Sequence, residues 1–215
     1  MEYIDFLARW GHILFGIAWI GLLYYFNFVQ GGYMNAASDE AKVDAFTKLV
    51  PSALWWFRWA AALTFLTGVI LLYYIMTALS TGIVLGVVMG TIMAANVWFV
   101  IWPNQKVVIA SNESIQGGGE ADPNAAGAAA KALLASRTNT FFSAPMVYFM
   151  VAHMHGEGLQ GTPLSTTGMI VGLVIIAAIE ANALWGKTMV LTTVRGVIVS
   201  SLVLTVIMAV VAAAL

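Results

Sequence analysis

Long apolar stretches with almost no charge inside them dominate this chain. A helix needs about 20 apolar residues to cross the hydrocarbon core of a bilayer, and six stretches reach or approach that length. The predicted membrane-spanning helices cover residues 5–30, 51–78, 82–102, 139–155, 164–185 and 196–215. The sequence therefore predicts an all-α, polytopic integral membrane bundle of about six transmembrane helices, forming a single domain over residues 1–215.

Most connections between the spans are short, but those at residues 31–50 and 103–138 are long and polar. In the first connection, Ser38 precedes two acidic residues, which is typical of a cap at the start of a short surface helix. In the second, we expect Pro103 to end the third span, because proline has no backbone N–H to continue a helix. A glycine-rich break follows, and an alanine-rich helix from about Pro123 is expected to lead into the fourth span.

Two features inside the spans predict how the helices pack. Pro145 interrupts the hydrogen-bond pattern of the fourth span, and we expect a neighbouring helix to satisfy the carbonyl group that it frees. Small residues recur every four positions in the third and fifth spans: Gly82, Gly86, Gly90 and Ala94, then Gly168 and Gly172. This spacing lets helix backbones approach closely in lipid, so we expect tight contacts along both spans.

Composition agrees with a chain immersed in lipid. Apolar residues make up 61% of the 215 residues and charged residues only 9%, whereas a soluble domain carries about a quarter charged residues. The net charge of −1 and the lack of a basic run argue against nucleic-acid binding. The chain contains no cysteine, which excludes disulfides, thiolate metal sites and covalently attached c-type haem.

Basic residues collect at one end of the predicted spans and give the expected orientation. Of the 9 lysine and arginine residues, all except Arg9 fall on the side where the first span ends. The positive-inside rule makes that side cytoplasmic, so both termini are expected in the periplasm of a bacterial inner (cell) membrane. Tryptophans gather at the same boundary, as an interfacial belt would: Trp55, Trp56, Trp59, Trp98, Trp102 and Trp185.

All 3 histidines fall on the outer side of the predicted bundle. His12 lies about two turns into the first span, and His153 and His155 end the fourth. Ionisable groups inside spans are candidates for function, and Gly16 and Trp19 share the helix face of His12. The glycine leaves room for a flat macrocycle, and the tryptophan could pack against the side of that macrocycle. The arrangement predicts a b-type haem held by His12 and His153, with His155 as the substitute ligand.

The same histidines allow other interpretations. In one alternative no cofactor is needed. His12 would donate a hydrogen bond to a carbonyl of a neighbouring helix, and His153 and His155 would be hydrated residues at the end of the fourth span. A copper or zinc site made of the three histidines and Glu157 is a further alternative, although the spacing matches no strong metal template.

Glu180 is the other ionisable residue inside a span, and burying its charge in the membrane costs free energy. It is expected to face the bundle and to find a polar partner, and a structural ion pair is favoured over a proton relay. The candidate partners are Arg58, Arg195, Asn96 and Asn182. Elsewhere, the polar residues 102–106 and 137–140 are expected to hydrogen-bond each other's exposed backbone groups.

Three segments together resemble a known family. The first two are Arg-Trp-Gly-His at residues 9–12, with the aromatic-rich run that follows it, and Trp-Phe-Arg-Trp at residues 56–59. The third is Arg-Thr-Asn-Thr at residues 137–140, followed by Pro145 and His153. They resemble the N-terminal membrane domain of the membrane-bound urate oxidase (urate hydroxylase) family, and the similarity covers roughly the first 155 residues.

Members of that family typically join this membrane domain to a C-terminal periplasmic cytochrome c, oxidise urate and pass the electrons onward. The resemblance therefore implies an oxidoreductase or electron-transfer setting. The sequence departs from the family pattern, because it has no cysteine for a cytochrome c domain and is shorter than the usual membrane domain. Its fourth span also ends in His153-Met154-His155, which leaves the family histidine ambiguous. A self-sufficient urate oxidase is therefore not expected.

We accordingly expect a membrane protein that contacts lipid and acts in electron transfer. Its partner would be a separate cytochrome c, or it would be a subunit of a larger respiratory or photosynthetic complex. A cofactor-free accessory subunit that packs against partner helices is the alternative. A permease that uses Glu180 and the histidines is less favoured, because the sequence shows no broken helices of the transporter kind.

Overall fold

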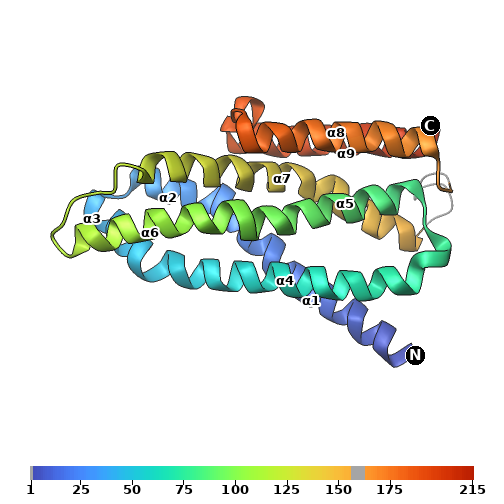
Figure 1. Ribbon diagram of the computed structural model, residues 1–215, viewed down its shortest axis with the longest axis horizontal. Coiled ribbons are helices and arrows are strands. Elements are labelled where there is room, and N and C mark those ends of the chain that lie inside the picture. Colours follow the sequence, from blue (N-terminus) through green and yellow to red (C-terminus); the bar gives the residue numbers. More distant parts are fainter. Residues whose placement is uncertain (1, 156–162) are drawn as a thin grey trace.

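Helices lie side by side along one long axis of the protein (Figure 1). The computed structural model describes residues 2–155 and 163–215. The α-helices are α1 Glu2–Tyr24, α2 Gly31–Ala36, α3 Asp39–Asp44, α4 Val50–Ile75, α5 Thr81–Ala95, α6 Trp102–Gln116, α7 Ala125–His155, α8 Thr166–Trp185 and α9 Val194–Ala214. The π-helical segments η1 Tyr25–Gln30, η2 Ala45–Leu49 and η4 Asn96–Ile101 join several of them without a break, and η3 Met76–Ala78 and η5 Met189–Thr192 are 3-10 turns. These described residues contain no β-strand, which confirms the predicted all-α class.

Helix α7 lies between the α8–α9 pair on one side and the continuous α5–α6 helix on the other (Figure 1). Helix α1 packs along α4 on the far side of the bundle. The core forms where these layers meet, and its largest fully buried side chains include Phe57, Leu85, Met89, Phe142 and Phe149. Both chain ends lie at the same end of the long axis, as the orientation predicted from the basic residues requires (Figure 1).

Several helices fit a multi-pass membrane protein. By length and composition, five described helical stretches are able to cross a membrane: Glu2–Ala36, Asp39–Ala78, Thr81–Gln116, Thr166–Trp185 and Val194–Ala214. They correspond to five of the six predicted spans. Helix α7 contains the remaining one, at residues 139–155, but its polar run from Arg137 to Thr140 and its terminal histidines make it less apolar. That span stays a prediction.

Two predicted helix ends are wrong. The third span does not stop at Pro103, because α5 passes through η4 into α6, which runs to Gln116. Pro103 lies in the first turn of α6, directly after a π-helical segment that loosens the hydrogen-bond ladder and tolerates the missing N–H. The first span likewise continues through η1 into α2, so the connections at 31–50 and 103–138 are largely helical.

Other local predictions are confirmed. Ser38 caps α3, since its Oγ accepts a hydrogen bond from the Ala41 backbone N–H at 3.3 Å. The glycine-rich break separates α6 from α7, and Gly118 there has a φ of 82°, which glycine adopts without strain. Pro145 lies inside α7, and the carbonyl four residues earlier accepts a hydrogen bond of 2.9 Å from Ser201 Oγ on α9. A neighbouring helix therefore satisfies the group that the proline frees.

The small residues also pack as expected. A Cβ atom added at Gly86 of α5 would lie 3.1 Å from Phe149 Cβ of α7. A Cβ atom at Gly172 of α8 would lie 2.5 Å from Leu85 Cδ1 of α5. Both glycines thus allow close contact between helices, as their spacing predicts.

Candidate functional site at the outer end of the bundle

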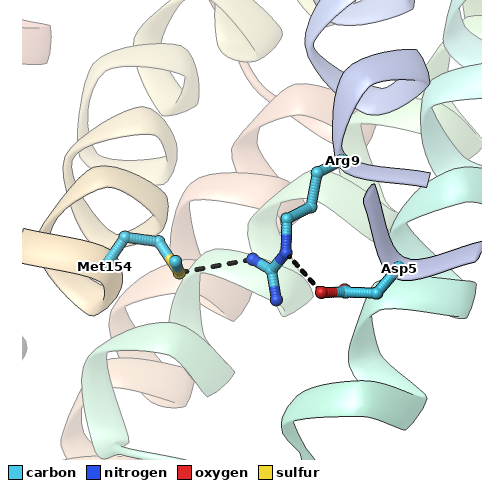
Figure 2. Close-up of polar contacts among 3 residues, drawn as sticks. All are labelled: Asp5, Arg9 and Met154. Carbon is cyan, nitrogen blue, oxygen red and sulfur yellow. Dashed lines mark hydrogen bonds and ion pairs between the residues drawn. The ribbon is translucent and has the colours of Figure 1, made fainter. Parts of the chain in front are cut away.

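The ends of α1 and α7 meet through a short polar chain at the end of the bundle that carries the N-terminus, which we call the outer end. Arg9 Nε donates a hydrogen bond to Asp5 Oδ2, one turn earlier on α1, at 3.0 Å (Figure 2). Arg9 Nη1 reaches across to α7 and lies 3.3 Å from Met154 Sδ (Figure 2). Because Met154 stands between His153 and His155, this contact brings both of these histidines to the outer end of α1.

His12 faces α4, where two groups hold its imidazole. Its Nδ1 lies 2.9 Å from the Thr64 carbonyl oxygen and 3.2 Å from Thr67 Oγ1. A carbonyl only accepts, so Nδ1 is the donor and carries the hydrogen, and Nε2 keeps its lone pair. A Cβ atom at Gly68 would lie 3.1 Å from His12 Cε1, so the ring rests against the backbone of α4 at a glycine.

The two histidines of α7 differ from each other. His155 is exposed, and its Nδ1 bonds the Val151 carbonyl of its own helix at 3.0 Å. His153 is partly buried, and its Nδ1 has no hydrogen-bond partner within the described part of the chain. Because α7 stays helical to His155, the two side chains diverge, as their spacing predicts. The two would face the same way only if the helix end unwound at Gly156, which lies outside the described residues.

Gly16 and Trp19 were expected to cradle a cofactor. A Cβ atom at Gly16 would meet Thr64 Cγ2 of α4 at 3.9 Å, an ordinary contact, so α4 occupies that side of the glycine. Trp19 is only 2% exposed and belongs to the hydrophobic core. Its indole Nε1 is buried without a hydrogen-bond partner among the described residues. The role of both residues beside a cofactor stays a prediction.

A metal site of three or more side chains does not form in residues 2–155 and 163–215. No group of three His, Cys, Asp or Glu residues there is arranged to hold a metal ion. The three histidines therefore supply no such site by themselves. Glu157, the fourth ligand of the alternative copper or zinc site, lies outside the described residues.

A second polar cluster joins α5, η4, α7 and α8 inside the bundle. Asn96 Nδ2 donates hydrogen bonds to Asn139 Oδ1 and to Glu180 Oε2, both at 3.0 Å. Asn139 Nδ2 in turn donates to the Met93 carbonyl at 2.9 Å. One of the candidate partners of Glu180 is therefore confirmed, but it is the amide of Asn96, and the expected ion pair is not among the salt bridges of the described residues.

The polar run at the start of the fourth span bonds different groups from those expected. Asn139 reaches the end of α5, and Arg137 Nη1 donates a hydrogen bond of 2.7 Å to the Leu191 carbonyl in η5. Arg137 thereby ties α7 to the turn that connects α8 with α9. The expected partner was the segment at residues 102–106, which instead continues as the helix α6.

Sequence reasoning missed the α4 residues that hold His12. Thr64, Thr67 and Gly68 are spaced by three and four positions, so they form one face of α4. That spacing was the available signal. It does not tell which helix the face meets, and only the packing of α1 against α4 supplies that information.

Comparison with protein families matches residues 73–214 to the family described as urate oxidase N-terminal. The matched region contains Arg137, Asn139, Pro145 and His153, and it begins after the segment around His12. Comparisons with curated proteins and with solved structures gave no match. Since the family match covers well over half of its residues, the chain belongs to the urate oxidase N-terminal family.

Proposed function

We propose that this protein binds a b-type haem near its outer end and acts in electron transfer, alone or as a subunit of a larger redox complex. His12 is the first ligand and His153 the second. The observation that carries the proposal is the state of His12, whose Nδ1 donates to the Thr64 carbonyl and so leaves the lone pair on Nε2, the nitrogen that would bind the metal. Histidine ligands of metals usually donate their other ring nitrogen to a carbonyl in this way.

His12 and His153 would hold the haem through their ring nitrogens. His153 carries a buried ring nitrogen with no partner among the described residues, and an unsatisfied buried polar group costs about 1–3 kcal/mol. A haem between two histidines supplies reversible one-electron chemistry. The Thr64 carbonyl fixes the tautomer of His12, and Gly68 lets its ring lie against α4. Arg9 adds a positive charge at the outer rim, held by Asp5.

The proposal is tested by a reduced-minus-oxidised visible spectrum of the detergent-purified protein. We expect a b-type band that is lost in His12→Ala and in His153→Ala. His155→Ala serves as the matched control and is expected to keep the band, because His155 is exposed and bonded to its own helix. A featureless spectrum from folded wild-type protein, confirmed by circular dichroism, would refute the haem and the electron-transfer proposal together.

A cofactor-free accessory subunit is the second candidate. It is favoured by the bonding of both His12 and His155 to backbone carbonyls, since neither then needs a metal to satisfy Nδ1. The broad apolar surface of α1 and α9 also suits contact with lipid or partner helices. If this candidate holds, His12→Ala lowers stability without changing any visible absorbance.

We propose further that both termini lie in the periplasm of a bacterial inner membrane. The cysteine-free chain allows a direct test with single cysteines, Tyr3→Cys near the N-terminus and Gln116→Cys at the end of α6, both at exposed positions. In spheroplasts, a membrane-impermeant maleimide is expected to label the cysteine at position 3. It should label the one at position 116 only after the membrane is permeabilised. The reverse pattern would invert the orientation and place the histidines on the cytoplasmic side.

A further inference from the structure

Two positive charges share one indole ring between α4 and α6, at the level of the exposed tryptophans of α4. The Arg58 guanidinium of α4 lies over Trp102 of α6, with its Cζ 3.4 Å from the ring centroid. The ammonium group of Lys106, one turn further along α6, lies 5.7 Å from the same centroid. An indole face attracts cations, so both positive charges are drawn to the ring of Trp102. We call these three residues the Arg58 cluster.

Among the described residues, no carboxylate forms a salt bridge with the cations of this cluster. Arg58 Nε and Nη1 are buried, and neither has a hydrogen-bond partner within residues 2–155 and 163–215. In that part of the chain the salt bridges lie elsewhere, at Arg9–Asp5, Lys42–Asp39 and Lys48–Asp44. A guanidinium carries N–H donors in a fixed fork that matches the oxygen atoms of a carboxylate or phosphate. Arg58 therefore has the donors for an anion that the described chain does not provide.

The cluster lies where lipid headgroups would reach it. On the turns of α4 around Arg58, three tryptophans are exposed: Trp55, Trp56 and Trp59. Trp59 packs edge-to-face on Trp98 of η4, with 5.6 Å between ring centroids. Tryptophans concentrate at the headgroup level of a membrane. Basic pockets between helices on the cytoplasmic side are suited to anionic headgroups. This position, on the side rich in basic residues, favours a phosphate-bearing ligand.

We propose that Arg58, Trp102 and Lys106 form a binding site for a phosphate group at the level of the tryptophan belt, between α4 and α6. The phosphate oxygens accept hydrogen bonds from Arg58 and offset both positive charges. Gln105 stands beside the cluster on α6, and its buried Oε1 also lacks a partner among the described residues, so a hydroxyl group next to the phosphate suits this site. The site lies on other helices than the proposed haem ligands and is independent of the proposed function.

A phosphate group reaches this position either from an anionic phospholipid or as a free ion, and two measurements distinguish the sources. Native mass spectrometry of the detergent-purified full chain, titrated with phosphatidylglycerol, measures lipid binding. Isothermal titration with inorganic phosphate measures binding of the free ion. The variants are Arg58→Gln, Arg58→Lys and Lys106→Gln. Lys131→Gln is the matched control, because Lys131 is an exposed cation on α7 that is not part of the cluster.

We expect Arg58→Gln to weaken phosphate-group binding about tenfold or more, the effect of losing one charge-assisted contact. Lys106→Gln, at an exposed residue, is expected to weaken it by less and to leave the fold intact. Arg58→Lys keeps the charge but loses the planar fork, so an intermediate affinity is expected. If Arg58→Gln weakens binding of phosphatidylglycerol alone, the site binds a lipid. If it weakens binding of inorganic phosphate alone, the site binds a soluble ligand. Equal binding by the wild type, Arg58→Gln and Lys131→Gln, or no binding by the wild type, overturns the proposal.

Discussion

Asn139→Ala is expected to lower the free energy of unfolding by about 2–3 kcal/mol, because it removes two buried hydrogen bonds. Asn139 is 0% exposed. Its Oδ1 accepts a hydrogen bond from Asn96, and its Nδ2 donates one to the Met93 carbonyl. Removing the side chain leaves one N–H of Asn96 and the second lone pair of Met93 without a partner in a region that water does not reach. The hydrogen bond from Asn96 Nδ2 to Glu180 remains in this variant.

The matched control for this prediction is Asn112→Ala. Asn112 lies on α6, is only partly buried, and donates its one side-chain bond to the Val108 carbonyl of its own helix. Its loss is expected to change the free energy of unfolding by less than about 1 kcal/mol, since water is able to replace the bond. Titration of each variant in dodecyl maltoside with sodium dodecyl sulfate, followed by circular dichroism, gives the two values. Equal transition midpoints for the two variants would show that the Asn139 bonds do not contribute net stability.

The apolar pattern predicted the helices well but placed several of their ends wrongly. Hydropathy marks where lipid begins and ends, and a helix is free to continue beyond the lipid wherever other contacts support it. Helix α6 is such a case: Val108 and Ile109 are buried against neighbouring elements although the helix as a whole is polar. Pro103 predicts a helix end because proline breaks a regular α-helix. The π-helical segment η4 directly before it lets the helix continue through the proline. No residue type in the sequence predicts a π-helical segment.

The candidate site could be predicted only in part for a related reason. His12 was identifiable because an ionisable group inside an apolar span is rare. Its partner was not, because lipid is as apolar as the protein core, so hydropathy does not show which face of α4 turns inward. Thr64 is buried while Leu66 and Ile70, close by on the same helix, are exposed. The rotation of α4 about its axis therefore comes from packing, and with it the hydrogen bond that holds His12.

Glu180 shows where charge counting fails. Arg58 and Arg195 were considered partners because opposite charges attract strongly in a medium of low dielectric constant. Arg58 instead stacks on Trp102, and Arg195 is exposed at the start of α9. The carboxyl group of Glu180 meets a neutral amide that α7 already holds in place.

Gly86→Leu is expected to destabilise the bundle by about 1–3 kcal/mol, the usual cost of forcing extra carbon atoms into a packed core. At Gly86 a Cβ atom alone would lie 3.1 Å from Phe149 Cβ and 3.6 Å from the Met146 carbonyl oxygen, so α5 and α7 must separate to admit a leucine.

Gly21→Leu is the control for this steric effect, because a Cβ atom at Gly21 of α1 meets nothing within 4 Å. Replacing that glycine is expected to leave stability unchanged or to raise it by up to about 1 kcal/mol through helix propensity. Unfolding titrations in detergent of the two variants should therefore move in opposite directions. If both variants lose stability equally, replacing any glycine is what destabilises the protein. Gly86 would then not be needed for the close approach of α5 to α7. If only Gly86→Leu loses stability, the contact between these two helices holds α7, with His153 at its outer end and Asn139 in its middle, at a fixed position in the bundle.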